Sequence, residues 1–236
     1  MGISIQQQAS WKSTEQALEA WRNAFAEVGI FVFKDAFHVK DYFGFCLYDE
    51  EFPIIYVNNS CPKSRQIFTL FHELGHLIFH TSGVDVVDDS YIKHLPDDDQ
   101  KIEVICNGLA ARVLVPDEIF EKMMASNEPN RDTASNLASY FSVSREVIYR
   151  KMLNRKLIST EEYGAAAKFW AAQVKPPQKD GGNYYNSQYV YLGQRYIDLA
   201  FTRYHQRRFD GVQLAEYLNI KPKNLPTFEA KFGSAF

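Results

Sequence analysis

Cysteine is scarce in this sequence, and the segments that mark secreted or membrane proteins are missing. The three cysteines, Cys46, Cys61 and Cys106, are odd in number and form no CxxC pair, which argues against a disulfide framework or a cysteine-based zinc cluster. The opening MGISIQQQAS lacks the basic and apolar parts of a signal peptide. No apolar run reaches the roughly 18 residues of a membrane span. We therefore expect a soluble, cytoplasmic protein that does not interact with a membrane.

Positive charge is not in excess either. The 26 Lys and Arg residues are outnumbered by 29 Asp and Glu residues, which gives a formal net charge of −3. Because nucleic-acid-binding domains are usually basic, we expect no direct binding of nucleic acid. The hydrophobic content of 46% over 236 residues is enough for one sizeable core, which excludes a disordered chain.

Residue patterns along the chain predict a mainly helical α+β fold. Three short β-type segments follow an opening helix, and we expect them to form a small antiparallel sheet. An acidic loop separates two further helices, and a helix-turn-helix rhythm comes after them. The expected helices cover 13–29, 64–83, 100–116, 117–125, 131–160 (two helices around a turn) and 161–173, the strands 30–34, 42–49 and 52–58, and the acidic loop 84–99.

Composition divides the chain into two parts. Residues 174–188 are rich in Pro, Gly and polar side chains, which is typical of a linker or long loop. We therefore expect a main domain over 1–173 and a helical C-terminal region over 189–236. The main domain would contain the small sheet (30–58) and the helical layer over 131–160.

The segment TLFHELGHLIFH, residues 69–80, places polar side chains in an otherwise apolar helix. His72 and His76 are one helical turn apart, so their imidazole nitrogens can converge on one metal ion. Glu73 is offset by about 100° around the helix and would lie beside that ion. There it could take a proton from a water whose pKa zinc lowers to about 7. Because such residues are costly to bury without partners, the pattern indicates a zinc site.

The third ligand is not provided by the same helix. His80 would lie about 12 Å from His72 along the helix axis, so we interpret it as a helix-end residue. The extended metzincin motif requires Gly and His where this chain has Phe79 and Ser82. A carboxylate from a second helix is the other common solution.

Glu103 is the best placed of the remaining carboxylates. The aspartates at 85, 88, 89 and 97–99 fall in a loop that we expect to be solvated. Glu103 lies in the next helix, where small residues such as Ala110 would allow close packing against Gly75. Asn107, one turn later, could hydrogen-bond a metal ligand. Spacing alone leaves Glu103 as either a ligand or an ordinary exposed glutamate. Cys106 is more typical of a small buried apolar residue.

The segments RQIFTLFHELGH and IEVICNGLAARVLVP together resemble the ImmA/IrrE metallopeptidases, whose pattern is approximately FTLxHELGH followed by ExxANxFAxxLLMP. Cys106, Leu109 and Val115 depart conservatively from it. The resemblance is strong over about 60–120 and looser beyond. It implies a zincin-like, gluzincin-type fold over 1–173, with Zn²⁺ held by the residues at 72, 76 and 103 and Glu73 as the general base.

The resemblance also implies a substrate and a biological role. It predicts an endopeptidase that cleaves a helix-turn-helix (Xre-like) repressor or antitoxin, which would derepress stress, phage or mobile-element genes. Many relatives carry a repressor domain before the peptidase, and this chain begins almost directly with the peptidase unit, so we expect a separately encoded partner. The alternative is a non-proteolytic zinc protein that regulates by binding a repressor or DNA.

Two further residues are candidates for contacting the substrate. Arg150 could hold a substrate carbonyl or carboxylate, and Tyr140 could stabilise an oxyanion. Residues 145–156, REVIYRKMLNRK, are locally basic and could instead contact DNA phosphates. We favour a solvated helix face over DNA binding because the overall charge gives no support.

Overall fold

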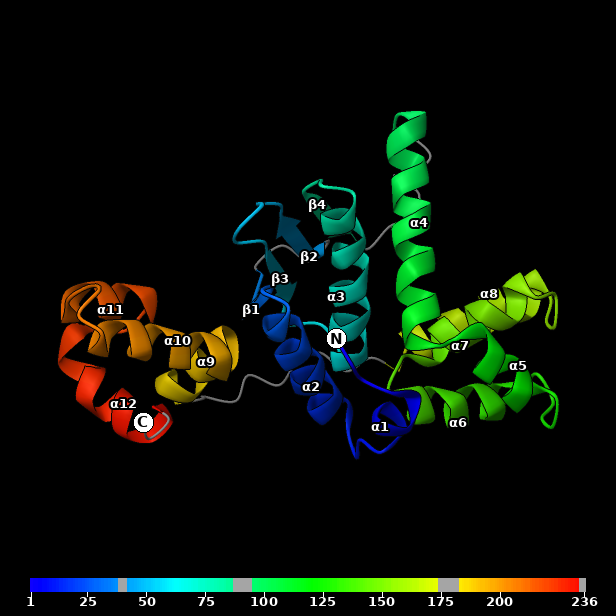
Figure 1. Cartoon of the computed structure of the whole chain (residues 1–236). Helices are drawn as coiled ribbons and strands as arrows, with labels where there is room; N and C mark the ends of the chain where they lie inside the picture. Colours follow the sequence, from blue (N-terminus) through cyan, green and yellow to red (C-terminus); the bar gives the residue numbers. More distant parts are fainter. Residues whose placement is uncertain (38–41, 87–94, 174–182, 234–236) are drawn as a thin grey trace.

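The computed structural model describes residues 1–37, 42–86, 95–173 and 183–233. A four-stranded mixed sheet is surrounded by helices, and the view in Figure 1 places α3 between the sheet and α4. The predicted α+β, mainly helical fold class is confirmed. None of the described helices combines the length and apolar character needed to cross a bilayer. The main-domain elements are α1 (Ile5–Ala9), α2 (Thr14–Glu27), β1 (Phe31–Asp35), β2 (Tyr42–Leu47), β3 (Ile54–Asn58), α3 (Lys63–Ile78), β4 (Gly83–Val86), α4 (Asp97–Leu114), α5 (Asp117–Met124), α6 (Arg131–Phe141), α7 (Arg145–Asn154) and α8 (Thr160–Ala171).

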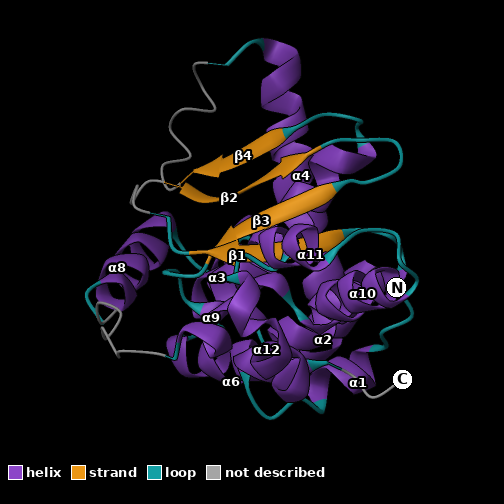
Figure 2. Cartoon of the chain, turned by 90° about the vertical axis from the view of Figure 1, so that its left-hand side faces the viewer, coloured by secondary structure: helices purple, strands orange, loops and turns teal. Residues whose placement is uncertain are grey.

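The sheet has the order β1-β3-β2-β4 (Figure 2), and it differs from the expected antiparallel sheet in two ways. β1 and β3 are parallel, whereas β2 is antiparallel to both β3 and β4. β3, with Ile55 and Val57 fully buried, occupies an interior position, and β1 pairs with its far side. The fourth strand, β4, was expected to be part of an acidic loop.

Close contact between α3 and the sheet depends on Gly44 in β2. A Cβ atom at this position would lie 2.5 Å from the Thr69 Cγ2 atom of α3 and 2.6 Å from the Tyr56 carbonyl oxygen. Only a glycine leaves room for both neighbours. The other face of α3 packs along α4, so α3 is covered on both sides and its polar residues from Gln66 onward are buried.

The helices α6 and α7 form the predicted helix-turn-helix layer. Ser142, in the expected SVS turn, adopts φ 54°, and Val143 is buried behind it. The side chain of Lys151 extends from α7 to the Val115 carbonyl oxygen at 2.6 Å. This layer therefore supports the C-terminal end of α4. Gln8 of α1, an element that the sequence did not predict, supports it too, because its side-chain amide donates to the carbonyl oxygens of Leu114 and Phe141.

The C-terminal helices form a second hydrophobic core. They are α9 (Tyr184–Leu192), α10 (Gln194–His205), α11 (Gly211–Tyr217), the 3₁₀ turn η2 (Pro222–Asn224) and α12 (Leu225–Phe232). Their buried residues include Phe201, Leu218 and Phe228. Residues 184–188 are helical although we expected a linker over 174–188, and 174–182 lie outside the described residues.

Candidate metal centre

Three side chains from α3 and α4 bring their ligand atoms together. His72 Nε2 and His76 Nε2 are 3.2 Å apart, and each lies 3.3 Å from an oxygen of the Glu103 carboxylate. A tetrahedral zinc ion with bonds of about 2.0–2.1 Å holds its ligand atoms about 3.3 Å apart. The three residues are buried. Their spacing and chemistry therefore fit a His₂Glu metal site.

The charges of the metal-free cluster are strongly coupled. Burial opposes the charged form of Glu103, but hydrogen bonds from His72 and His76 outweigh it and lower the pKa of this carboxyl to about 2. Burial likewise lowers the pKa of His72, but the hydrogen bond with Glu103 and the nearby carboxylates of Asp85 and Glu73 together outweigh it, so the net shift is upward. Without a metal, the Glu103 carboxylate and the His72 imidazole thus favour each other's charged form.

Asn107 orients the first histidine. Its Oδ1 atom lies 3.1 Å from His72 Nδ1, one helical turn after Glu103 on α4. A carbonyl oxygen at this distance accepts a hydrogen bond from Nδ1–H, which leaves Nε2 free to bind a metal. Asn107 thus lies at the place that the sequence spacing suggested.

Glu73 is a buried carboxyl with His72, His76 and Cys46 among its neighbours. The side chain is fully inaccessible, and neither carboxylate oxygen has a hydrogen-bond partner among the described residues. Burial raises the pKa of Glu73 above its ordinary value. An unpaired buried carboxyl is costly, and such groups concentrate at functional sites. Its burial next to His72 in the chain is compatible with the general base that the sequence predicts.

Gly75 permits the close approach of α3 and α4. A Cβ atom on Gly75 would be 2.6 Å from Cys106 Sγ and 3.0 Å from Cys106 Cα. The expected close packing of the two helices is confirmed, and Cys106 is buried as a small apolar residue.

Gly83 and Cys46 also line the site, and neither was predicted from the sequence. We had interpreted Gly83 only as the end of a helix, but a Cβ atom there would lie 2.4 Å from the Cδ2 atom of His76. The Gly83 N–H donates to Cys46 Sγ at 3.2 Å. The Cys46 side chain lies beside the Glu73 carboxyl and lowers its pKa, which opposes the effect of burial. Pairing of β2 with β4 creates these contacts. A strand of only four residues leaves no recognisable pattern in the local sequence.

Asp85 corrects the expectation of a solvated acidic loop. It is buried in β4 and accepts hydrogen bonds from Arg65 Nη2 at 2.6 Å and Thr69 Oγ1 at 2.7 Å. The Arg65 guanidinium also stacks on the Phe43 ring at 3.6 Å. This network fastens β4 to α3 beside the metal ligands. The residues at 97–99 belong to the exposed first turn of α4, and those at 88 and 89 lie outside the described residues.

The remaining candidates lie apart from the cluster. Tyr140 is exposed on α6 and packs against Phe141. Arg150 donates from Nε to the Tyr163 hydroxyl at 3.0 Å, and its guanidinium lies over that ring. Neither side chain has a contact with the ligands among the described residues, so their substrate roles stay predictions. His80 stacks on Tyr48 beyond the end of α3.

Known proteins similar to this chain include a peptidase family and two metalloproteases. A family described as the IrrE N-terminal-like domain, a peptidase family, matches residues 25–153. Two relatives, both named radiation response metalloprotease IrrE, are 31% identical over 103 residues and come from Deinococcus radiodurans and Deinococcus deserti. The alignments cover 41% of this chain and 30% and 34% of the two relatives, so the match spans about a third of their length. The family match contains the whole of α3 and α4, and the chain belongs to the ImmA/IrrE family of metallopeptidase-like domains.

Proposed function

We propose that this chain is a cytoplasmic zinc-dependent endopeptidase. The observation that carries the proposal is Glu73, a buried carboxyl with both oxygens unpaired, directly after the first of the two histidines. A purely structural metal site does not need such a base. It also usually closes its fourth position with a protein ligand, whereas here three protein ligands converge.

Zinc is the metal that the ligands favour. Two imidazoles and one carboxylate are a common catalytic zinc set, and the ion would polarise a peptide carbonyl and acidify a bound water. His72, His76 and Glu103 would hold the metal, and Asn107 would keep the His72 ring oriented. Glu73 would accept the proton of the attacking water and deliver it to the leaving amine.

The proposed substrate is a helix-turn-helix repressor or antitoxin. Membership of the family and the radiation response in the names of both relatives support this choice. Cleavage would derepress stress, phage or mobile-element genes, and the chain would act as the protease or toxin of such a pair.

The test is incubation of the zinc-loaded protein with a repressor encoded beside it, followed by mass spectrometry of the products. We expect cleavage by the wild type and a loss of at least a hundredfold in Glu73→Gln, with the metal content unchanged. Glu118→Gln, on the exposed first turn of α5, is the matched control. Derepression in cells that persists with Glu73→Gln would instead identify a non-proteolytic regulator.

A further inference from the structure

The C-terminal helices repeat the turn geometry of the α6–α7 layer. Asn219, after α11, has φ 49°, and Ser142, after α6, has φ 54°. In both places the next residue donates its backbone N–H to an alanine carbonyl five residues earlier: Ile220 to Ala215 at 2.9 Å, and Val143 to Ala138 at 3.0 Å. The two helices therefore end in the same left-handed cap, which also follows α3, α7 and α10.

The buried positions of the C-terminal unit follow the same pattern. Leu214 and Ala215 of α11 and Leu218 at its C-terminal cap are buried, as are Ile220 in the turn and Phe228 in α12. The helix α10 completes the unit, since its residues share this core. Three helices with a tight turn between the second and third are the arrangement of helix-turn-helix DNA-binding domains.

Charge separates this unit from the rest of the chain. Residues 184–233 contain seven Lys and Arg against four Asp and Glu, a net charge of +3, whereas the whole chain is −3. We expected no binding of nucleic acid from the net charge of the whole chain. That net charge is the sum of an acidic main domain and a basic C-terminal unit. A basic patch on one domain is the electrostatic feature that DNA binding requires.

The segment over η2 and α12 presents this charge to solvent. Lys221 and Lys223 are exposed, and neither side chain has a hydrogen bond or ion pair among the described residues. The carboxylate of the segment, Glu229, is hydrogen-bonded to His205 at 2.7 Å. Thr227 is exposed on α12, between the two lysines and Lys231. A helix with free cations at its start and a hydroxyl side chain along it fits contacts to DNA phosphates and base edges.

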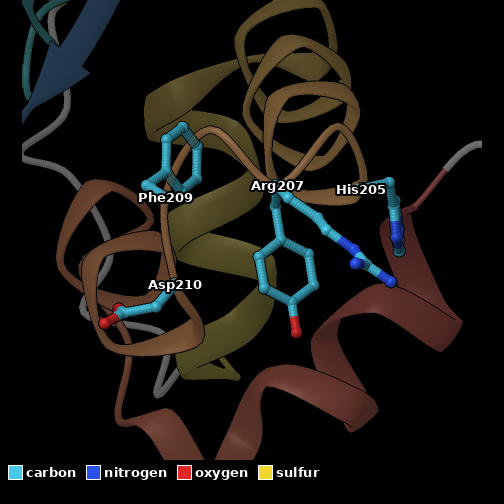
Figure 3. Close-up of a pocket in the computed structure, with 5 residues that line it drawn as sticks. His205, Arg207, Phe209 and Asp210 are labelled. Carbon is cyan, nitrogen blue, oxygen red and sulfur yellow. The ribbon is translucent and has the colours of Figure 1, made fainter.

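Arg207 and Arg208 extend the basic surface at the turn before α11. Both are exposed. Arg207 and Asp210 point to opposite sides of the pocket at this turn (Figure 3). The Asp210 carboxylate accepts hydrogen bonds from Val212 N and Gln213 N, so its charge is used to cap α11.

The α6–α7 layer has the same turn but not the same free charge. Arg155 pairs with Asp117 and Glu121, and Lys151 is buried against Asp117. The cations Arg145 and Arg150 contact Gln173 and Tyr163. Four of the five basic residues that had suggested DNA contact in this layer thus make contacts within the chain. Lys156 is the exception.

We propose that α10, α11 and α12 form a helix-turn-helix unit that binds double-stranded DNA, with Lys221 and Lys223 on the phosphates at the start of the segment over η2 and α12. The binding does not depend on the peptidase site. If the proposed repressor substrate is correct, a DNA-bound peptidase would meet its DNA-bound substrate at a raised local concentration.

The test is fluorescence anisotropy with a labelled, random-sequence DNA duplex of about 30 base pairs, three helical turns, and the full chain at increasing salt. We expect binding in the range of about 1–100 μM that weakens steeply as salt rises. Lys221→Gln/Lys223→Gln should weaken it at least tenfold and reduce the log–log salt slope by about two.

The matched control is Arg145→Gln/Lys156→Gln, which removes two charges from the α6–α7 layer and should leave the affinity unchanged. Glu73→Gln should bind DNA like the wild type, which separates this proposal from the peptidase. Circular dichroism checks that each variant is folded. Absence of binding by the wild type, or equal weakening by both double variants, would overturn the proposal.

Discussion

Gly83 lies directly against the imidazole ring of His76, and a Cβ atom at this position would come within 2.4 Å of the ring carbon Cδ2. The first residue of β4 therefore restricts the position of a candidate metal ligand on α3. The contact joins two elements that are consecutive in the chain but belong to different layers, and it makes the site sensitive to changes outside the HELGH segment.

We predict that Gly83→Ala lowers the affinity for zinc by about 10–100-fold, the range typical of changes beside a metal ligand. The added methyl group must displace either the His76 ring or β4. Gly108→Ala is the control, because a Cβ atom at Gly108 of α4 meets nothing within 4 Å. It should keep the affinity and stabilise the fold by about 0.5–1 kcal/mol. Competition with a chromogenic chelator measures both, and equal affinities in the two variants would refute the steric argument.

Removal of the third ligand should abolish tight metal binding. Glu103→Ala leaves two imidazoles, so we expect about one zinc ion per chain in the wild type and less than a tenth of that after dialysis of the variant. Val104→Ala, at the exposed neighbouring position, should bind as the wild type does. Elemental analysis decides the matter, and full zinc content in Glu103→Ala would exclude Glu103 as a ligand.

Asn107→Ala should weaken zinc binding less than the loss of a ligand, by about 10–100-fold. The variant frees the His72 ring to rotate, because the 3.1 Å contact at Nδ1 is lost. Asn107→Asp retains an acceptor oxygen and should recover most of the affinity. Isothermal titration calorimetry compares the three proteins, and an Asn107→Asp variant as weak as Asn107→Ala would contradict an orienting role.

The metal-free protein should be most stable at mildly acidic pH. The pKa of Glu103 is about 2 in the folded chain against an ordinary value of 4.5, so its stabilising effect is present above 4.5 and is lost as the pH falls toward 2. The pKa of His72 is raised from 6.5, so its contribution is complete below 6.5 and is lost as the pH rises through the raised value. Thermal unfolding in EDTA at a series of pH values measures the loss of stability at both low and high pH.

Glu103→Gln should flatten both limbs of that profile, because the carboxylate is the partner of both histidines. Asp98→Asn, at an exposed position of α4, should leave the profile unchanged. A Glu103→Gln profile with the same curvature as the wild type would show that other groups control the pH dependence.

Asp85→Asn should destabilise the fold by about 2 kcal/mol, because charge-assisted hydrogen bonds to Arg65 and Thr69 are replaced by weaker ones. Asp99→Asn removes a charge from the exposed first turn of α4 and should cost no more than about 1 kcal/mol. Urea denaturation measures the free energy of unfolding of each. Equal losses would mean that the buried network contributes little.

Helix geometry alone predicted that His72 and His76 would face one ion, because residues four apart share a helix face. Glu103 needed the family resemblance, since many carboxylates follow the HELGH segment and spacing did not separate them. Gly83 and Asp85 escaped prediction because β4 is defined by its pairing with β2, a contact between distant residues. The parallel pairing of β1 was missed for the same reason.

Arg22 links the C-terminal helices to the main domain through hydrogen bonds. Its buried guanidinium donates to the Val32 carbonyl oxygen of β1 and to the carbonyl oxygens of Val190 and Tyr191 at the end of α9. A chain shortened before α9 would remove two acceptors of this cation, together with the helix that packs against β1, and leave it with Val32 and Glu19. Loss of activity in such a truncated protein would then report damage to the peptidase fold, and point substitutions are the sounder way to assign a role to the C-terminal unit.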